Sequence, residues 1–181
     1  LRLQSILHPV AKRFLSEALA DADRAGAALM VVELDTPGGL LSSTREISTA
    51  MLGAATPVAV YVAPSGAQAA SAGFFLLMAA DFAAMAPGTN TGAAHPVGGQ
   101  GETIEGVMGE KVEQDAAATI RALAGRHGRN VALAEEAVVK SRSFTDQEAL
   151  ALGLADVVAP DLAQLLVALD GRAWDKAGRK G

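Results

Sequence analysis

The sequence contains no cysteine, which excludes disulfide bonds, a thiol nucleophile and cysteine-ligated metals. Aromatic residues make up only 4% of the chain although 50% is hydrophobic, so its core must be built mainly from Ala, Val, Leu and Ile. Charged residues are also few, at 19% against about 25% in an average globular chain. With 15 basic and 20 acidic residues, the net charge of −5 argues against nucleic acid as a partner.

No stretch of the sequence reads as a membrane span. Residues 51–80 carry no charge and exceed the roughly 20 residues that a span needs. Pro57, the turn at 64–66 and Gln68 break this run into pieces that we expect to form a buried strand, a loop and a buried helix. The chain begins at Leu1 rather than Met, and we expect the full-length protein to carry a signal peptide or flanking membrane helices.

Helix and strand patterns alternate along the 181 residues, which favours one α/β domain. Strands are expected at 28–34, 58–62, 82–85 and 155–159, and helices at 14–25, 42–52, 71–80, 111–127, 132–140 and 162–169. Capping boxes of Ser43 with Glu46 and of Thr145 with Glu148 predict where two helices begin. Each of the two is a serine or threonine followed three residues later by a glutamate.

Two segments lack regular patterns. Residues 87–109 are rich in Gly, Thr and Asn and show little periodicity, which is typical of a functional or mobile loop. We expect this segment to gate a site. The basic tail over 171–181 is expected to be frayed.

Two glycine-rich turns each follow a buried strand, and sites in open α/β sheets form beyond the carboxyl ends of the strands. In 35–39 (DTPGG), adjacent glycines let a peptide N–H point into a cleft, where it can stabilise an oxyanion. In 66–73 (GAQAASAG), Ser71 lies at the expected start of an apolar helix, whose free N–H groups suit a developing negative charge. Each turn alone is also explained by a plain turn or a capping serine. Together they favour a serine nucleophile.

A serine nucleophile needs a base, and the sequence offers few. Lys111 opens an expected helix and can act as a base only if burial lowers its pKa; beside Glu110 and Glu113 it can equally be a surface lysine. His95 needs less pKa adjustment but also a carboxylate that orients it. The other two histidines, His8 and His127, look peripheral.

Three segments in this order, 33–39 (ELDTPGG), 69–73 (AASAG) and 85–93 (MAPGTNTGA), resemble the protease domain of NfeD-type membrane-bound serine proteases. That family belongs to the Clp protease/crotonase-like superfamily and is related to signal peptide peptidase A. The resemblance covers about residues 14–168. It implies a Clp protease/crotonase-like α/β fold, with a mostly parallel sheet flanked by helices, and a single catalytic domain over 1–181.

The resemblance also implies the residues of the site. Ser71 matches the family nucleophile, and Lys111 matches the general base of a Ser–Lys dyad. Gly39 and Ala72 match the donors of the backbone N–H groups in the oxyanion hole. Neither a metal nor a cofactor is implied.

His95 falls where the Clp proteolytic subunit carries its catalytic histidine, but Ser141 stands where that subunit has its aspartate. The lysine is therefore preferred, and His95 stays the alternative base in a Ser–His, Clp-like peptidase. Two further alternatives are a crotonase-like acyl-CoA enzyme and a catalytically inactive scaffold that binds a membrane partner.

The implied activity is a serine endopeptidase that hydrolyses peptide bonds in hydrophobic segments of membrane-associated proteins, stomatin-like ones among them. An extended substrate is expected to pair along the edge at 38–39. A homodimer or larger homo-oligomer is expected. The full-length protein would be membrane-associated with an extracytoplasmic catalytic domain, and residues 1–181 by themselves would be soluble.

Overall fold

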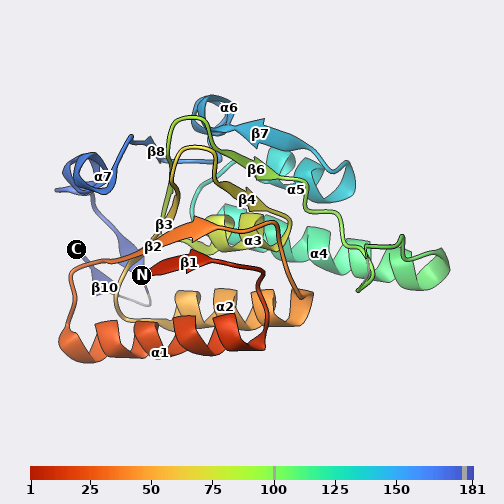
Figure 1. The fold of residues 1–181 in the computed structure, drawn as a ribbon, viewed down its shortest axis with the longest axis horizontal. Helices are drawn as coiled ribbons and strands as arrows, with labels where there is room; N and C mark the ends of the chain where they lie inside the picture. Colours follow the sequence, from red (N-terminus) through yellow and green to blue (C-terminus); the bar gives the residue numbers. More distant parts are fainter. Residues whose placement is uncertain (100, 177–178) are drawn as a thin grey trace.

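The computed structural model describes residues 1–99, 101–176 and 179–181 (Figure 1). Its strands are β1 (Arg2–Gln4), β2 (Met30–Asp35), β3 (Val58–Val62), β4 (Gln68–Ala70), β5 (Phe82–Met85), β6 (Asn90–Gly92), β7 (Ser143–Thr145), β8 (Val157–Val158), β9 (Asp175–Lys176) and β10 (Arg179–Lys180). Its helices are α1 (Pro9–Ala25), α2 (Leu41–Gly53), α3 (Ala72–Ala79), α4 (Gly106–Arg126), α5 (Val131–Val139), α6 (Asp146–Ala151) and α7 (Leu162–Leu169). No helix within the described ranges combines the length and the hydropathy needed to cross a membrane.

The larger sheet has five strands, all parallel, in the order β1-β2-β3-β5-β8. Because side chains alternate across a strand, β3 sends Val58, Val60 and Val62 into one apolar cluster and Ala59 and Tyr61 into another on the opposite face. The first cluster also contains side chains of α1 to α5, and the second contains those of α7 (Figure 1). The expected mostly parallel sheet flanked by helices is confirmed.

A smaller sheet, in the order β4-β6-β7, adjoins the carboxyl end of β2 through an isolated bridge between Thr36 and Ala69. β4 and β6 are parallel, and β6 and β7 are antiparallel. β6 lies inside the segment 87–109, of which residue 100 is outside the described residues, so the expectation that this segment is irregular is wrong for its first part. Its Asn-Thr-Gly sequence carries no hydrophobic alternation, and it is held by backbone pairing and by the Thr91 hydroxyl, which donates to the Ala69 carbonyl at 2.7 Å.

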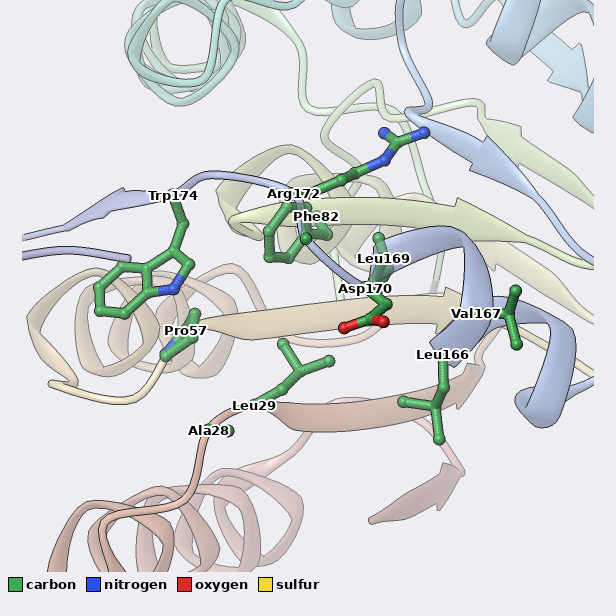
Figure 2. A pocket seen from close by; sticks show the side chains of 11 residues that line it. Ala28, Leu29, Pro57, Phe82, Leu166, Val167, Leu169, Asp170, Arg172 and Trp174 are labelled. Carbon is green, nitrogen blue, oxygen red and sulfur yellow. The ribbon is translucent and has the colours of Figure 1, made fainter.

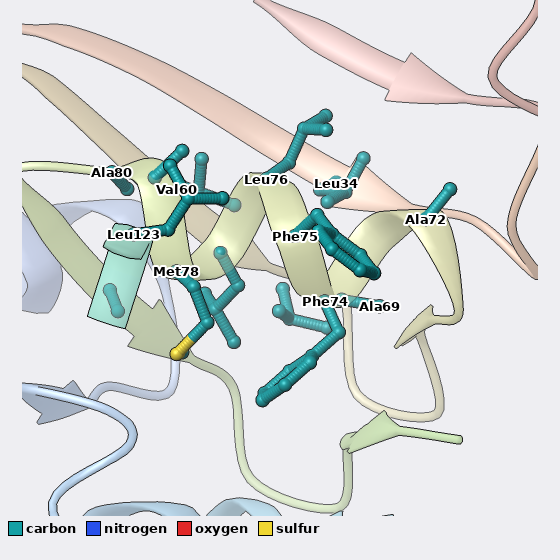
Figure 3. Close-up of a cluster of buried hydrophobic side chains, with 14 of the residues drawn as sticks. Leu34, Val60, Ala69, Ala72, Phe74, Phe75, Leu76, Met78, Ala80 and Leu123 are labelled. Atoms are coloured by element: carbon teal, nitrogen blue, oxygen red, sulfur yellow. The ribbon is translucent and has the colours of Figure 1, made fainter. Parts of the chain in front are cut away.

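Every residue of α3 is buried, which explains why its sequence is apolar all round. Figure 3 shows Phe74, Leu76 and Met78 projecting from different sides of this helix among side chains such as Val60 of β3 and Leu123 of α4. Burial of each large apolar side chain contributes about 1.5–3 kcal/mol. The buried helix therefore rigidly supports Ser71, the residue directly before it.

The capping box expected at the start of α2 is wrong. The N-cap residue of α2 is Leu40, without a side-chain hydrogen bond, and Ser43 is buried inside the helix. The Leu40 N–H instead donates to the Leu7 carbonyl oxygen at 2.8 Å. A contact between residues so far apart in sequence leaves no local pattern, so the Ser43–Glu46 spacing predicted the wrong start for α2.

The long helix α4 begins at Gly106, which places Lys111 in the second turn rather than at the start of the helix. The other expected capping box is confirmed: the Thr145 hydroxyl accepts from the Glu148 N–H, and the Glu148 carboxylate accepts from the Thr145 N–H at 2.9 Å. Local capping signals thus located one of the two helix starts that they predicted.

The C-terminal tail packs against the body of the protein. β9 and β10 pair antiparallel, and the ammonium of Lys176, a buried residue, donates to the Asp81 carboxylate at 2.7 Å and to the Thr56 carbonyl at 3.1 Å. The expectation of a frayed tail is therefore wrong for this hairpin, in which 177–178 lie outside the described residues. The physical reason is an ion pair that basic composition alone does not reveal.

Replacing Lys176 with methionine is expected to lower the free energy of unfolding by about 3–5 kcal/mol, because the Asp81 carboxylate stays buried without its cation. Lys180→Met is the matched control, because Lys180 pairs with Asp175 on the surface, where such pairs contribute at most about 1 kcal/mol. Urea unfolding of both variants measures the difference. Equal midpoints for the two would show that the buried pair does not hold the tail.

His127, at the C-terminal end of α4, titrates abnormally. Burial of the ring and the neighbouring Arg129 guanidinium lower its pKa from 6.5 to about 4, and its Nε2 has no hydrogen-bond partner among the described residues. In the unfolded chain His127 therefore binds a proton as the pH falls below 6.5, whereas in the folded protein it does so only near pH 4.

Stability is expected to fall as the pH is lowered from 7.5 to 5, and His127 should account for about 1 kcal/mol of that fall, because the ring is partly open to solvent. His127→Gln removes the titrating group and should flatten the profile by that amount. Thermal or urea unfolding at both pH values measures it. A profile unchanged by the substitution would contradict the buried, neutral histidine.

Candidate functional site

The two glycine-rich turns predicted from the sequence lie together. Thr36 directly follows β2; its N–H donates to the Gln68 carbonyl at 2.7 Å, and its carbonyl accepts from the Ala70 N–H at 3.1 Å. β4 therefore runs alongside the first turn, and Ser71 directly follows β4. The structure thus brings Gly39 and Ser71 to one place, as the sequence predicted.

The backbone of Ser71 is strained. Its φ of 51° and ψ of −115° lie where residues with a Cβ are disfavoured, at a cost of about 1–3 kcal/mol. The Ser71 N–H donates to the Gly92 carbonyl at 2.8 Å, which holds this conformation. Its hydroxyl makes no cap hydrogen bond to α3 and has no hydrogen-bond partner among the described residues. These features disagree with a capping serine and suit a nucleophile presented on a sharp turn.

Glycine at position 38 permits the approach of the two turns. A Cβ on Gly38, whose φ is +133°, would lie 2.9 Å from the Ser71 Cβ and 3.3 Å from its Oγ. A Cβ on the next residue, Gly39, would lie 2.6 Å from the Leu7 Cα. Both glycines are therefore required by close packing, one against the serine and the other against the N-terminal segment.

Two backbone N–H groups beside Ser71 are unused. The Gly38 carbonyl and the Leu40 N–H bond to Leu7, each at 2.8 Å, and successive backbone groups of an extended segment point to opposite sides. The Gly39 N–H therefore points away from Leu7 and has no partner among the described residues. Ala72 is the first residue of α3, so its N–H has no intrahelical acceptor.

Ser71, Gly39 and Ala72 all line a cleft of about 600 Å³. Its walls are mainly apolar and come from the N-terminal segment, α2, α3, the segment after β6 and α4; the apolar side chains are those of Ile6, Leu7, Leu40, Leu41, Phe75, Val97, Ile104 and Val112. None of its described lining residues is Asp, Glu, Lys or Arg. The arrangement offers a hydroxyl, two N–H donors and a mainly apolar surface.

Lys111 does not lie in this cleft. The residue is exposed, it is absent from the cleft lining, and no hydrogen bond or ion pair within the described part of the chain holds its ammonium. The next residue of α4, Val112, does line the cleft. The structure therefore places Lys111, the predicted base, on α4 beside the cleft and not in contact with Ser71.

His95 is turned away from the cleft. Its neighbours Ala94 and Pro96 line the cleft and His95 does not. Its Nδ1 lies 3.1 Å from the Val138 carbonyl oxygen and 3.7 Å from the Glu113 carboxylate. The sequence did not predict this carboxylate partner for His95. The ring nevertheless faces α5 and α4, so the structure does not bring the alternative base to Ser71.

The expectation that His8 is peripheral is wrong, because His8 lines the cleft. Its Nδ1 accepts the Val10 N–H at 3.2 Å and caps α1. In the neutral ring the proton then sits on Nε2, which leaves no free lone pair for a base. Sequence reasoning missed His8 and Leu7 because both lie in a short N-terminal segment with no periodic pattern.

A second hollow of about 550 Å³ lies at the amino ends of the strands, away from Ser71 (Figure 2). Figure 2 shows Trp174, Leu29, Phe82 and Leu166 around it, with Asp170 and Arg172 as its charged side chains. None of the described residues that line it is a serine or a lysine. Among the described residues, no group of three His, Asp or Glu side chains is placed to hold a metal.

Comparison with known proteins gives three consistent results. The family model "NfeD1b, N-terminal domain" matches residues 3–172. The membrane-bound protease PH1510 of Pyrococcus horikoshii is 40% identical over 156 residues, which are 84% of this chain and 34% of that protein. The membrane protein NfeD1b of Bacillus subtilis is 38% identical over 92 residues, 51% of this chain and 20% of that protein. The chain thus spans about a third of the first relative and a fifth of the second.

Two solved structures extend the likeness to the fold. A lysine-to-alanine mutant of the 1510-N membrane-bound stomatin-specific protease, in complex with a substrate peptide, superimposes with a TM-score of 0.93 at 32% identity, covering 99% of this chain and 84% of that one. A serine-to-alanine mutant of the same protease gives 0.91 at 33% identity, covering 98% and 87%. The chain therefore belongs to the NfeD1b N-terminal domain family and has the Clp protease-like fold of the 1510-N proteases.

Proposed function

We propose that the protein is a serine endopeptidase in which Ser71 is the nucleophile and Lys111 the general base. The observation that carries the proposal is the geometry of Ser71: a strained residue with a free hydroxyl, flanked by the unused N–H groups of Gly39 and Ala72 in an apolar cleft. Strain of this kind persists where the surrounding structure imposes it, and it concentrates at active sites. The relative PH1510 and the 1510-N structures, which are named as proteases, support the same reaction.

In the proposed reaction, neutral Lys111 Nζ takes the proton of the Ser71 hydroxyl while Oγ attacks the peptide carbonyl carbon. The carbonyl oxygen becomes an oxyanion and accepts hydrogen bonds from Gly39 and Ala72. Collapse of this intermediate breaks the C–N bond, and Lys111 gives its proton to the leaving amine. Water then attacks the acyl-enzyme with Lys111 again as base, releasing the acid and restoring Ser71.

This mechanism requires Lys111 to approach Ser71 when substrate binds. Val112, the next residue of α4, already lines the cleft, and the proposed approach combines a movement of the first turns of α4 with a new lysine rotamer. An apolar substrate would remove water from the cleft, and desolvation lowers the pKa of an amine. Val97 and Ile104 line the cleft within the segment that precedes α4, and we assign to this segment the role of gate.

The proposed substrate is an apolar peptide segment of a membrane-associated protein. A mainly apolar wall, whose described residues include no Asp, Glu, Lys or Arg, favours apolar residues on both sides of the cleaved bond. The expected pairing edge needs a correction, because Leu7 occupies the Gly38 carbonyl and the Leu40 N–H. The backbone of Gly39 itself faces the cleft and remains for an extended substrate.

Because the similar 1510-N protease is stomatin-specific, a stomatin-like protein is the proposed partner. The relative PH1510 is named as membrane-bound, which supports membrane association of the full-length protein. An extracytoplasmic catalytic domain is a further part of the proposal, taken from the sequence resemblance. The proposed assembly state is a homodimer or a larger homo-oligomer. A crotonase-like reaction is disfavoured, since the described lining of the cleft contains no carboxylate for its acid–base chemistry and no Lys or Arg for the phosphates of coenzyme A.

A matched peptide panel tests the proposal. Peptides with an uninterrupted apolar segment are incubated with wild type and with Ser71→Ala, beside the same peptides carrying Lys or Glu in that segment, and the products are mapped by mass spectrometry. We expect cleavage within the apolar segment by wild type alone. Cleavage that persists in Ser71→Ala, or that prefers the charged peptides, would contradict the proposal.

A further inference from the structure

The side chain of Thr36 links the two turns of the site. Thr36 is fully buried, and its backbone N–H and carbonyl are both used by β4. Its Oγ1 donates to the Gly38 carbonyl at 3.0 Å and accepts from the Gly38 N–H at 3.1 Å. Its Cγ2 lies 2.6 Å from where a Cβ of Gly73 would be, so its methyl group packs against the first turn of α3.

The bond to Gly38 has a consequence for the next residue. The carbonyl of Gly38 and the N–H of Gly39 belong to one planar, trans peptide unit, in which the two bonds point in opposite directions. Whatever fixes the Gly38 carbonyl therefore fixes the Gly39 N–H. Two donors hold that carbonyl: the Thr36 hydroxyl at 3.0 Å and the Leu7 N–H at 2.8 Å.

We infer that Thr36 is a positioning residue that aims the Gly39 N–H at the developing oxyanion, an inference that rests on the proposed function. A hydroxyl is required, because the same atom must donate to the Gly38 carbonyl and accept from the Gly38 N–H. The methyl group has a separate task, since it packs beside Gly73 and supports the turn that presents Ala72. Thr36 thus contacts Gly38, which precedes the donor Gly39, and Gly73, which follows the donor Ala72.

The two parts of the side chain can be removed separately. Thr36→Val keeps the shape and the methyl group and deletes the hydroxyl, which leaves the Gly38 carbonyl with the Leu7 N–H as its one remaining donor and lets the peptide unit between Gly38 and Gly39 tilt about that bond. Thr36→Ser keeps the hydroxyl and deletes the methyl group. Because an oxyanion donor acts mainly in the transition state, loss of aim should lower kcat and leave KM nearly unchanged.

The experiment measures kcat and KM for an apolar peptide, and inhibition by a matching peptide aldehyde, whose adduct with Ser71 places an oxyanion in the same hole. We expect Thr36→Val to lower kcat at least about tenfold, with KM within about threefold of wild type, and to weaken the aldehyde by a similar factor. Thr36→Ser should keep kcat within about threefold. If Thr36→Val does not fold, the pair Thr36→Ser and Thr36→Ala carries the test, because these two differ in the hydroxyl alone.

The outcomes separate the two claims. Wild type no more active than Ser71→Ala overturns the proposed function, and the inference with it. Wild type active with Thr36→Val at the wild-type kcat overturns the inference alone. A purely structural threonine would lower the melting temperature of both variants and leave kcat of the folded fraction unchanged, and that result also contradicts the inference.

Discussion

Replacing Ser71 with alanine is expected to lower the rate of apolar-peptide hydrolysis by about 10⁴-fold or more, because no other group supplies the attacking oxygen. The fold should survive, since the Ser71 hydroxyl makes no hydrogen bond to α3 and the N–H that holds the turn through Gly92 is retained. Initial rates measured by product mass spectrometry, with thermal unfolding of the same samples, check both statements.

Two control variants sharpen this prediction. Ser65, in the preceding turn, is exposed and lies outside the cleft lining, so Ser65→Ala should keep full activity. Ser71→Gly should be as inactive as Ser71→Ala yet more stable than wild type by about 1 kcal/mol, because glycine adopts a φ of 51° readily. A capping serine predicts the opposite, a loss of stability. Full activity in Ser71→Ala would contradict the assignment of Ser71 as the nucleophile.

Replacing Lys111 with alanine is expected to lower kcat by about 10²–10⁴-fold, the range that a general base contributes. Lys111→Arg should be equally impaired, because arginine keeps the positive charge but does not deprotonate in proteins. Lys140→Ala, which removes another exposed lysine of the same domain, is the matched control and should keep wild-type kcat. Steady-state kinetics on one apolar peptide measure all three.

His95→Ala distinguishes the lysine from the alternative base. The ring faces the Val138 carbonyl and the Glu113 carboxylate instead of the cleft, so its removal should change kcat no more than a few fold. The reverse pattern, with full activity in Lys111→Ala and a large loss in His95→Ala, would replace the dyad by a Ser71–His95 pair oriented by Glu113.

The parts of the site that the sequence predicted are those coded by residue type over a few positions. The adjacent glycines 38 and 39 predicted a backbone N–H exposed to a cleft, and the structure places both residues in the cleft lining. The small, apolar segment after Ser71 predicted a buried helix, and α3 is buried along its whole length. The strand patterns at 58–62 and 82–85 likewise predicted β3 and β5 as they are.

The parts that could not be predicted depend on contacts between distant segments. Leu7 reaches the turn after β2 from an N-terminal segment with no pattern, and this contact sets the start of α2. The hydrogen bonds of the Thr36 hydroxyl to the Gly38 backbone could not be predicted either, because threonine is common after a strand and its sequence position does not reveal these bonds. The burial of Lys176 depends on Asp81, which lies far away in the chain.

The central claim is that Ser71 is nucleophilic because Lys111 takes its proton, and covalent labelling tests it most directly. Wild type and Lys111→Ala are treated with a fluorophosphonate that carries an apolar chain, so that the probe itself fills the cleft, and the modified residue is identified by mass spectrometry. The account predicts a label on Ser71 in wild type and labelling at least about 100-fold slower in Lys111→Ala. Labelling of Ser71 at the same rate in both proteins would contradict it.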